Sequence, residues 1–184
     1  MNKPYLIVVT GRPGSGKSTF SKAFGDEACL PVVSRDKIKE GYVHTFGKPH
    51  TSLSPQANGI ASRIFKETLI SLIDEGVSVI AEAAFQHGLW SQMLEPFREK
   101  ARIYIVICKT DDHIAYDRYI KRGLADAKRE YFHGDIGVDA ARMGAEPDIS
   151  PYNDPCIEGA PTIYVDTTAE YIPSISEIIR EIFG

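Results

Sequence analysis

Cysteine is scarce in this 184-residue chain, which contains only Cys29, Cys108 and Cys156. Because these residues are odd in number and widely spaced, they fit neither a disulfide framework nor a metal-binding knuckle. We therefore expect reduced thiols in a cytoplasmic protein. Long hydrophobic runs are also lacking. No segment approaches the length of a membrane span, and the apolar run near the N-terminus is too short for a signal peptide.

A positive net charge is absent as well. Asp and Glu outnumber Lys and Arg by 25 to 21, which gives a formal net charge of −4 at pH 7. Without an overall basic field a nucleic-acid partner is less expected, although a local basic patch could still bind one. The length and the ordinary hydrophobic fraction of 43% predict one globular domain over residues 1–184.

Five short apolar runs, separated by helical patterns, have the length and composition of β-strands. They cover residues 5–10, 31–34, 77–82, 102–109 and 162–166. Strands that alternate with helices predict an α/β fold, in which helices cover both faces of a parallel sheet. In such sheets ligands bind beyond the carboxyl ends of the strands. The residues that end each strand are therefore the first candidates for a site.

Two helical patterns are well marked. Apolar residues recur at helical spacing between residues 54 and 75 and stop at Gly76, which is typical of a helix end. A last helix is expected to contain Ile172 and the isoleucines that follow it. Ser174 and Glu177 have the spacing of a capping box at its start.

A glycine-rich loop follows the first predicted strand. It reads Gly11-Arg12-Pro13-Gly14-Ser15-Gly16-Lys17-Ser18-Thr19 and matches the pattern G-x-x-x-x-G-K-[ST] between a strand and a helix. Glycines let backbone N–H groups curl toward a phosphate, and the positive end of the following helix adds to the attraction. In this pattern Lys17 reaches the β- and γ-phosphates, and the Ser18 hydroxyl ligates Mg²⁺. All nine residues are candidate nucleotide-binding residues.

The chain lacks the Asn-Lys-x-Asp element with which GTPases usually read guanine. ATP is therefore the predicted nucleotide and Mg²⁺ the predicted metal ion. The remaining question is whether the terminal phosphate goes to water, to another molecule or nowhere at all.

Acidic residues follow several of the predicted strands. Asp36 could accept a proton from an attacking hydroxyl group, as phosphoryl transfer to an alcohol requires, or it could equally cap the next helix. Glu82 could hold a Mg²⁺-bound water, bind hydroxyl groups of the acceptor, or be a structural carboxylate at the sheet edge. Asp111 and Asp166 each precede a helix-start pattern, so we expect both to be caps.

Arg118 and Arg122 lie one turn apart on a predicted helix and therefore share a face. Residues 124–161 are rich in Gly and Pro, and we predict that they form a lid or mobile insertion. Gly123 favours a break in the helix, and Arg129 would then belong to this lid. Arginines that close over the γ-phosphate stabilise the charge on its oxygens in the transition state. The alternative is a solvated cationic face that pairs with nearby acids. We expect at least one of the three arginines to be catalytic.

Residues 41–59 are polar and are predicted to form a loop on the side where the phosphate acceptor binds. The stretch 41–66 contains no Asp or Glu, yet it holds several basic residues. This locally positive stretch favours a polar or anionic acceptor, such as a nucleotide, a sugar derivative or a nucleic-acid end. The alternative is a solvated loop whose composition has no functional meaning. The candidate acceptor-binding residues are Arg35, His44 and Glu82.

The chain resembles the P-loop kinases, and more narrowly the group that includes bacteriophage polynucleotide kinase, the zeta toxins and chloramphenicol phosphotransferase. In chain order, the resemblance rests on the glycine-rich loop, Ser34-Arg35-Asp36, Ile80-Ala81-Glu82, Arg118-x-x-x-Arg122-Gly123 and Tyr164-Val165-Asp166-Thr167-Thr168. It implies a three-layer P-loop fold with five parallel strands in the order 2-3-1-4-5, a lid, and ATP-dependent phosphate transfer to a hydroxyl group. It also implies that Asp36 is the general base and that Arg122, with Arg118 or Arg129, lies over the phosphates.

Two residues depart from the pattern of the polynucleotide kinases. Lys39 stands where those enzymes carry Arg, and Glu82 stands where they carry Asp, so a polynucleotide acceptor is less expected. The first hypothesis is therefore an ATP-dependent kinase that acts on a hydroxyl group of a small molecule or nucleotide. The alternatives are a polynucleotide 5′-hydroxyl kinase and an acceptor-independent ATPase or nucleotide switch.

Overall fold

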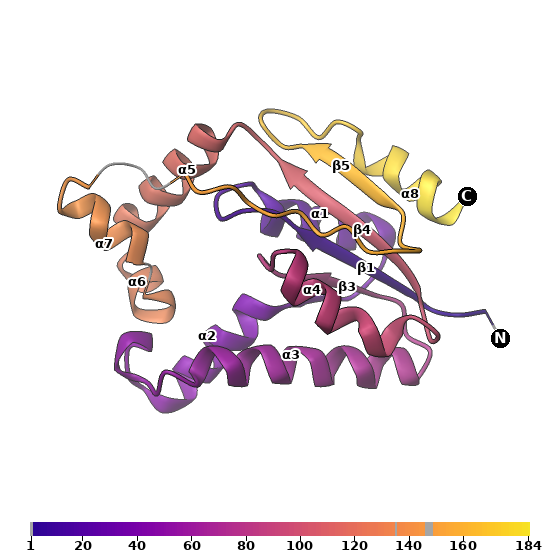
Figure 1. Cartoon of the computed structure of the whole chain (residues 1–184), viewed down its shortest axis with the longest axis horizontal. Coiled ribbons are helices and arrows are strands. Elements are labelled where there is room, and N and C mark those ends of the chain that lie inside the picture. Colours follow the sequence, from indigo (N-terminus) through magenta and orange to yellow (C-terminus); the bar gives the residue numbers. More distant parts are fainter. Residues whose placement is uncertain (1, 135, 146–148) are drawn as a thin grey trace.

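A five-stranded sheet lies at the centre of the computed structural model, which describes residues 2–134, 136–145 and 149–184. Neighbouring strands are parallel, and their order is β2-β3-β1-β4-β5 (Figure 1). The strands are β1 (Tyr5–Thr10), β2 (Val32–Ser34), β3 (Val79–Glu82), β4 (Arg102–Lys109) and β5 (Thr162–Asp166). The parallel sheet and the strand order expected from the sequence are confirmed.

Helices cover both faces of the sheet and complete the three layers. Helices α1 (Lys17–Ala28) and α8 (Ile175–Phe183) pack on one face, and α3 (Ala57–Asp74) and α4 (His87–Leu94) pack on the other (Figure 1). None of the helices in the described part of the chain is both long and apolar enough to cross a membrane.

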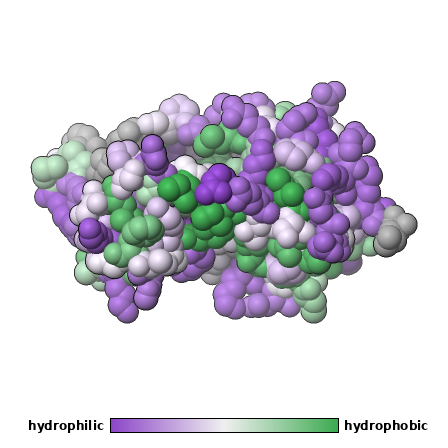
Figure 2. Space-filling view, turned by 90° about the horizontal axis from the view of Figure 1, so that it is seen from below, coloured by the Kyte–Doolittle hydropathy of each residue, from purple (hydrophilic) through white to green (hydrophobic). Residues whose placement is uncertain are grey.

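Strand β1 contributes to two apolar cores, because successive residues of a strand point to opposite faces. Leu6 and Val8 pack with apolar residues of α3 and α4. Ile7 and Val9 pack with apolar residues of α1 and α8. Figure 2 shows the side of the molecule that carries α2 and α3, where hydrophilic residues border a central group of apolar residues.

Residues 41–59, predicted to be a loop, form a loop only in part. Helix α2 (Arg35–Phe46) follows β2 directly, and α3 begins before residue 59. Between them lies a short 3-10 helix, His50–Ser52. The sequence pattern of α2 is weak because only Lys39 and Val43 are buried along its length.

Residues 124–161 comprise three kinds of structure. They begin with the end of α5 (Asp112–Ala125) and continue through the short helices α6 (Ala127–His133) and α7 (Ile136–Arg142). Residues 149–161 have no helix or strand, and we call them the return segment because they lead back to β5. Helices α6 and α7 lie at the end of the molecule where α2 also lies (Figure 1).

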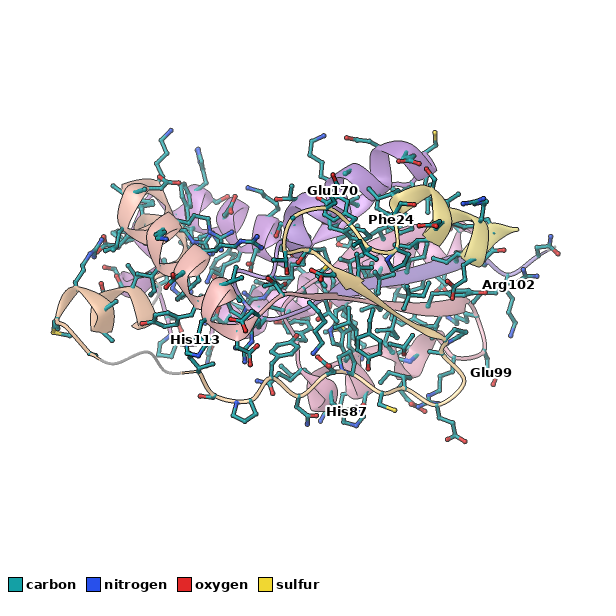
Figure 3. All side chains as sticks on the ribbon, turned by 90° about the horizontal axis from the view of Figure 1, so that it is seen from above. Phe24, His87, Glu99, Arg102, His113 and Glu170 are labelled. Atoms are coloured by element: carbon teal, nitrogen blue, oxygen red, sulfur yellow. The ribbon has the colours of Figure 1, made fainter. Side chains whose placement is uncertain are left out.

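The return segment is fastened to the body of the protein. The His87 backbone N–H donates to Asn153 O at 2.9 Å, and the Cys156 N–H donates to His87 Nδ1 at 3.2 Å. Lys109 at the end of β4 forms an ion pair with Asp154 at 2.5 Å. Figure 3 shows His87 beside this segment. Because of these contacts, a lid would have to be formed by the α6–α7 part of residues 124–161.

Two of the smaller predictions are wrong and one is confirmed. Asp111 caps α5, since its side chain accepts hydrogen bonds from two N–H groups of the first turn. Asp166 instead accepts from the N–H two residues on, within a turn, and the next helix, α8, starts later. Ile172 precedes α8 and pairs with Asp166 in an isolated antiparallel bridge. The residue before a proline is biased away from helix, and Pro173 follows Ile172.

The capping box predicted at the start of α8 is confirmed. Ser174 Oγ accepts from the Glu177 N–H, and Glu177 Oε2 accepts from the Ser174 N–H at 2.8 Å. We expect Ser174→Ala to lower the free energy of unfolding by about 1 kcal/mol, because α8 loses its N-cap. Urea unfolding measures this change. Ser174→Thr keeps the hydroxyl and is the control, so an equal loss in both variants would contradict the capping role.

Candidate active site

The glycine-rich loop between β1 and α1 has the backbone that a phosphate cradle needs. Gly14 and Gly16 have φ values of 84° and 81°, which residues with a side chain rarely adopt. Gly14 also lies directly against α5, because a Cβ on it would stand 1.9 Å from the Ala115 carbonyl oxygen. On another side the Thr167 hydroxyl oxygen lies 2.6 Å from Ser15 O and donates to it. The loop backbone is therefore held from two sides, by the Ala115 backbone of α5 and by the Thr167 hydroxyl after β5.

The residues that end the loop lie at the N-terminus of α1. Lys17 is the first residue of the helix and is only 7% exposed. The Ser18 hydroxyl donates to Glu82 Oε1 at 3.0 Å. A hydroxyl and a carboxylate oxygen this close suit Mg²⁺ beside a phosphate, and the loop backbone suits the phosphate itself. Ser18 would hold the ion directly and Glu82 would hold it through a bound water, whereas the loop N–H groups and Lys17 would hold the phosphates.

Glu82 is buried at the carboxyl edge of the sheet and joins three elements. It is 2% exposed, and it accepts a second hydrogen bond from Ser34 Oγ at 2.5 Å. Ser34 is also its partner in the register of β2 and β3. An ionised carboxylate is costly to bury unless hydrogen bonds replace its water, and here two hydroxyls do so. The contact with Ser18 favours the hypothesis that Glu82 holds a Mg²⁺-bound water, which stays a prediction.

Asp36 is not the cap of α2, so one of its two sequence interpretations is wrong. The N-cap is Ser34, whose Oγ accepts from the Lys37 N–H at 3.4 Å. Asp36 lies in the first turn of the helix, half-buried, with Oδ1 3.3 Å from Arg35 Nη1. The other interpretation, a general base, therefore remains. A general base must face a space in which an acceptor could bind.

Several cations act on the Asp36 carboxyl group. Burial alone would raise its pKa, but Lys17, His133 when protonated, Arg35 and Lys39 together lower the pKa below its ordinary value of 3.8. Asp36 is therefore ionised at neutral pH, which is the state that a proton acceptor needs.

Asp36 lines a cavity of about 210 Å³, which we call the central cavity. Pro13 of the loop lines it as well, and so do four polar residues named from the sequence: Lys17, Ser18, Arg122 and Arg129. These four come from α1, α5 and α6, whereas Asp36 comes from α2. The fold thus gathers around one space a lysine, a hydroxyl, a carboxylate and two arginines that are far apart in the sequence.

Four residues that line the central cavity were not predicted: Lys39, Ala84, Tyr119 and His133. Lys39 is 6% exposed, and its Nζ donates to His133 O at 3.2 Å. His133 Nε2 lies 3.0 Å from Glu40 Oε1. Burial, and then the nearby Arg129, lower the pKa of His133, against the opposing effect of Asp36. Two adjacent residues of α2 therefore hold α6 over the cavity, through a histidine that favours its neutral form.

A larger groove, of about 600 Å³, lies on another side of the loop, and we call it the donor groove. It is lined by Gly14, Gly16 and Thr19 of the loop and α1, by α5, and by the segment after β5. That segment includes Glu170, which Figure 3 labels near the turn after β5. A groove of this size beside the phosphate loop has room for the base and ribose of a nucleotide.

The three predicted arginines occupy different places. Arg118 donates to two backbone carbonyls after β5, at 3.1 and 2.6 Å, and forms part of the donor groove. Arg122 lines both the donor groove and the central cavity, so it lies where the two meet. The helix break was expected at Gly123, but α5 continues to Ala125 and the break follows there. Arg129 lies beyond the break, on α6. Arg122 thus borders both spaces, whereas Arg118 lines the donor groove and Arg129 lines the central cavity.

Within the described part of the chain, Arg35 and His44 lie outside the lining of the central cavity. Arg35 Nη2 donates to both the backbone O and Oδ1 of Asn58, at 3.0 Å each, and so joins α2 to α3. His44 is exposed, and its ring stacks toward Phe132 of α6 with centroids 6.5 Å apart. Their predicted contact with an acceptor stays a prediction, and Arg35 also acts on Asp36.

The strand order, the loop and the gathered cavity residues define the class of protein: this is a P-loop kinase fold. The chain belongs to the AAA domain family (AAA_33), whose model matches residues 6–136. That match spans the loop, Asp36, Glu82 and the three arginines.

Comparisons with individual proteins agree with this fold. A UPF0200 protein of Sulfurisphaera tokodaii is 25% identical over 121 residues, which cover 66% of this chain and 68% of that protein. A solved structure from Chloroflexus aurantiacus, described as a "putative kinase", has a TM-score of 0.74 and 24% identity over 99% of this chain and 95% of its own. The APS kinase CysC of Mycobacterium tuberculosis, in complex with AMPPNP and APS, has a TM-score of 0.61 and 18% identity over 99% and 96%.

Substitution of Gly14 tests the contact between the loop and α5. Gly14→Ala places a methyl group at an unfavourable φ and against the Ala115 carbonyl, so we expect at least a tenfold loss of ATP affinity and a lower free energy of unfolding. Gly41→Ala is the matched control, because nothing lies within 4 Å of its added Cβ. It should stabilise α2 slightly, by about 0.5 kcal/mol. Calorimetric ATP binding that is unchanged in Gly14→Ala would contradict this account.

The lowered pKa of Asp36 can be measured directly. In protein labelled with ¹³C at aspartate, the Asp36 carboxyl carbon should keep its ionised shift as the pH falls from 7 to about 4, near the ordinary Asp pKa. Arg35→Met removes one of the cations that lower the pKa, so the titration should move to higher pH. Lys37→Met removes an exposed neighbour that pairs with Glu40 instead and should leave it unchanged. A midpoint well above pH 4 in the unmodified protein would refute the prediction.

Proposed function

We propose that this protein is an ATP-dependent kinase that transfers the γ-phosphate of ATP to a hydroxyl group of a small molecule or nucleotide. The observation that carries the proposal is the central cavity, where Asp36 lines the same space as Lys17, Arg122 and Arg129. Transfer to an alcohol needs a carboxylate base close to the cations that hold the phosphate. Hydrolysis alone would not need space for a second molecule beside that base.

ATP is the proposed donor, with its base and ribose in the donor groove and its phosphates on the loop. The groove lies beside Gly14 and Gly16, and Arg122 lines both the groove and the central cavity. The chain also lacks the guanine-reading element of GTPases. The likeness in fold to a structure that contains AMPPNP supports an adenine nucleotide here.

In the proposed reaction the acceptor oxygen attacks the γ-phosphorus while Asp36 takes the hydroxyl proton. The bond between the γ-phosphorus and the β–γ bridging oxygen breaks, and ADP leaves with that electron pair. Lys17 and Arg122 stabilise the negative charge on the transferring phosphoryl oxygens. Mg²⁺ held by Ser18 and Glu82 would neutralise charge on the β- and γ-phosphates.

The charge of the central cavity supports a polar or anionic acceptor. Lys17, Lys39, Arg122 and Arg129 line it against the single carboxylate of Asp36. One or two of these cations are used by the phosphates of the donor. The remainder would attract a second anionic group, such as a phosphate or carboxylate carried by the acceptor.

We propose that residues 1–184 act as one kinase domain, with residues 41–59 on the acceptor side. The α6–α7 part of residues 124–161 would be the lid, because Arg129 and His133 of α6 line the central cavity. A cytoplasmic location is also proposed, and the three cysteines, which are free thiols in the structure, support it.

The proposal is tested by replacing the base. Asp36→Asn should lower phosphate transfer by about 10²- to 10⁴-fold, the usual contribution of a general base, and should leave ATP binding unchanged. Asp117→Asn is the matched control, because Asp117 is exposed on α5 and lies 3.8 Å from Lys121. Transfer is measured with γ-labelled ATP and Mg²⁺ against 5′-hydroxyl oligonucleotides, nucleosides and nucleotides, sugar derivatives and hydroxylated antibiotics.

The possible outcomes separate the hypotheses. Label that moves to one small acceptor only when Asp36 is present supports the proposal. Label that moves only to the oligonucleotide would identify a polynucleotide kinase. Label released as free phosphate, equally by the unmodified protein and Asp36→Asn, would identify an ATPase or switch and overturn the proposal.

A further inference from the structure

A third cavity, of about 300 Å³, lies next to the central cavity, and we call it the side cavity. It is enclosed by the loop, the residues after β3, α5, α7 and the return segment. Its volume is at the lower end of the range of about 300–1,000 Å³ that small-molecule pockets occupy. None of the roles proposed above uses this space.

The side cavity is lined by three tyrosines. Tyr116 and Tyr119 lie one turn apart on α5, and Tyr152 comes from the return segment. The Tyr152 hydroxyl donates to Phe85 O at 2.7 Å and lies 3.0 Å from Thr10 Oγ1. These bonds fix the position of its ring. Tyrosine rings held in this way offer flat apolar surfaces on which another ring can stack.

The walls between these rings are held by polar contacts and carry little free charge. Arg12 lines the cavity, but its Nη1 pairs with Asp112 at 3.0 Å and its Nη2 donates to Ser150 O at 2.7 Å. Gln86 Oε1 accepts from the Asn153 N–H at 3.1 Å. The cavity therefore suits a neutral, flat group, unlike the cationic central cavity.

The side cavity adjoins the central cavity. Pro13 and Tyr119 line both of them. In contrast, the side cavity and the donor groove have no lining residue in common within the described part of the chain. A molecule in the side cavity therefore lies next to the space that Asp36 lines, while the groove beside Gly14 and Gly16 is a separate place.

We propose that the side cavity binds an aromatic or heteroaromatic ring of the phosphate acceptor. This inference rests on the proposed function, because it identifies the part of the acceptor that does not react. The ring stacks among Tyr116, Tyr119 and Tyr152, and the hydroxyl group that it carries extends past Pro13 to Asp36. The acceptor class is accordingly a hydroxyl compound built on a ring or small fused-ring system, and an open-chain or saturated sugar derivative does not fill the site.

Ring binding is tested first without any transfer. ADP and Mg²⁺ at saturating concentration occupy the donor groove, and indole, benzyl alcohol and its saturated match cyclohexylmethanol are then titrated into protein labelled at tyrosine. We expect the two aromatic probes to shift the signals of Tyr116, Tyr119 and Tyr152 and to bind at least about tenfold more tightly than cyclohexylmethanol. Failure of the aromatic probes to bind to the ADP-saturated protein, or equal binding of the saturated match, would overturn the inference.

Variants of the cavity wall give the second test. Tyr116→Leu should weaken binding of the aromatic probes about tenfold, and Ala140→Trp, which fills the cavity from α7, should abolish it. Tyr164→Leu is the control, because Tyr164 is 55% exposed on β5 and lies outside the cavity. ADP affinity and the unfolding temperature should be unchanged in all three. Loss of probe binding in Tyr164→Leu, or its persistence in Ala140→Trp, would contradict the assignment.

Transfer assays separate this inference from the function on which it rests. If Asp36-dependent transfer occurs equally to acceptors with and without an aromatic ring, the side cavity is not the acceptor site, and the kinase proposal stands. If no acceptor is phosphorylated in an Asp36-dependent way, the kinase proposal fails, and with it the assignment of the ring to an acceptor. Transfer that requires both Asp36 and the ring, and that Tyr116→Leu weakens through KM, supports both.

Discussion

The arrangement of the site depends on one buried carboxylate. Glu82 lies at the end of β3, next to the central strand β1, and is almost inaccessible to water. Its carboxylate oxygens accept hydrogen bonds from the hydroxyls of Ser18 and Ser34. Ser18 lies in the first turn of α1, directly after the phosphate-binding loop. Ser34 is the N-cap of α2, the helix that carries Asp36. A polar group buried at this depth cannot lose either hydrogen-bond partner cheaply. The distance between the phosphate-binding residues and the proposed base is therefore set by hydrogen bonds to a side chain that need not touch any substrate.

Around this carboxylate the fold places the three cavities on different sides of the loop. The donor groove and the side cavity lie against different faces of the loop, and the central cavity lies between them, with Arg122 at one boundary and Tyr119 at the other. Both of these residues belong to α5, one turn apart. A single helix therefore borders the donor, the reacting groups and the proposed ring site. The register of the parallel strands makes this possible, because their carboxyl ends meet at one edge.

Much of this arrangement could be predicted from the sequence, and the failures have physical causes. The loop and the five strands are local signals, so their positions followed from glycine spacing and apolar runs. Lys39 follows Asp36 by three residues and therefore shares its helix face, a signal that was available but not used. His133 could not be found in this way, because it reaches the cavity only when α6 packs on α2. The side cavity likewise depends on the return segment crossing to α4, and no local pattern encodes such a contact between distant segments.

The closeness of Gly14 to the Ala115 carbonyl has a consequence for protein engineering. At Gly14 the loop and α5 meet backbone to backbone, without a side chain between them that could adjust. A designer who grafts the nine-residue loop onto another scaffold would therefore transfer a phosphate cradle without its arginines, unless α5 moved with it as a rigid unit. Conversely, substitutions on the solvent-exposed face of α5 leave the contact between Gly14 and the Ala115 carbonyl intact. The smallest transplantable module of this protein is thus a loop and a helix that are distant in the chain.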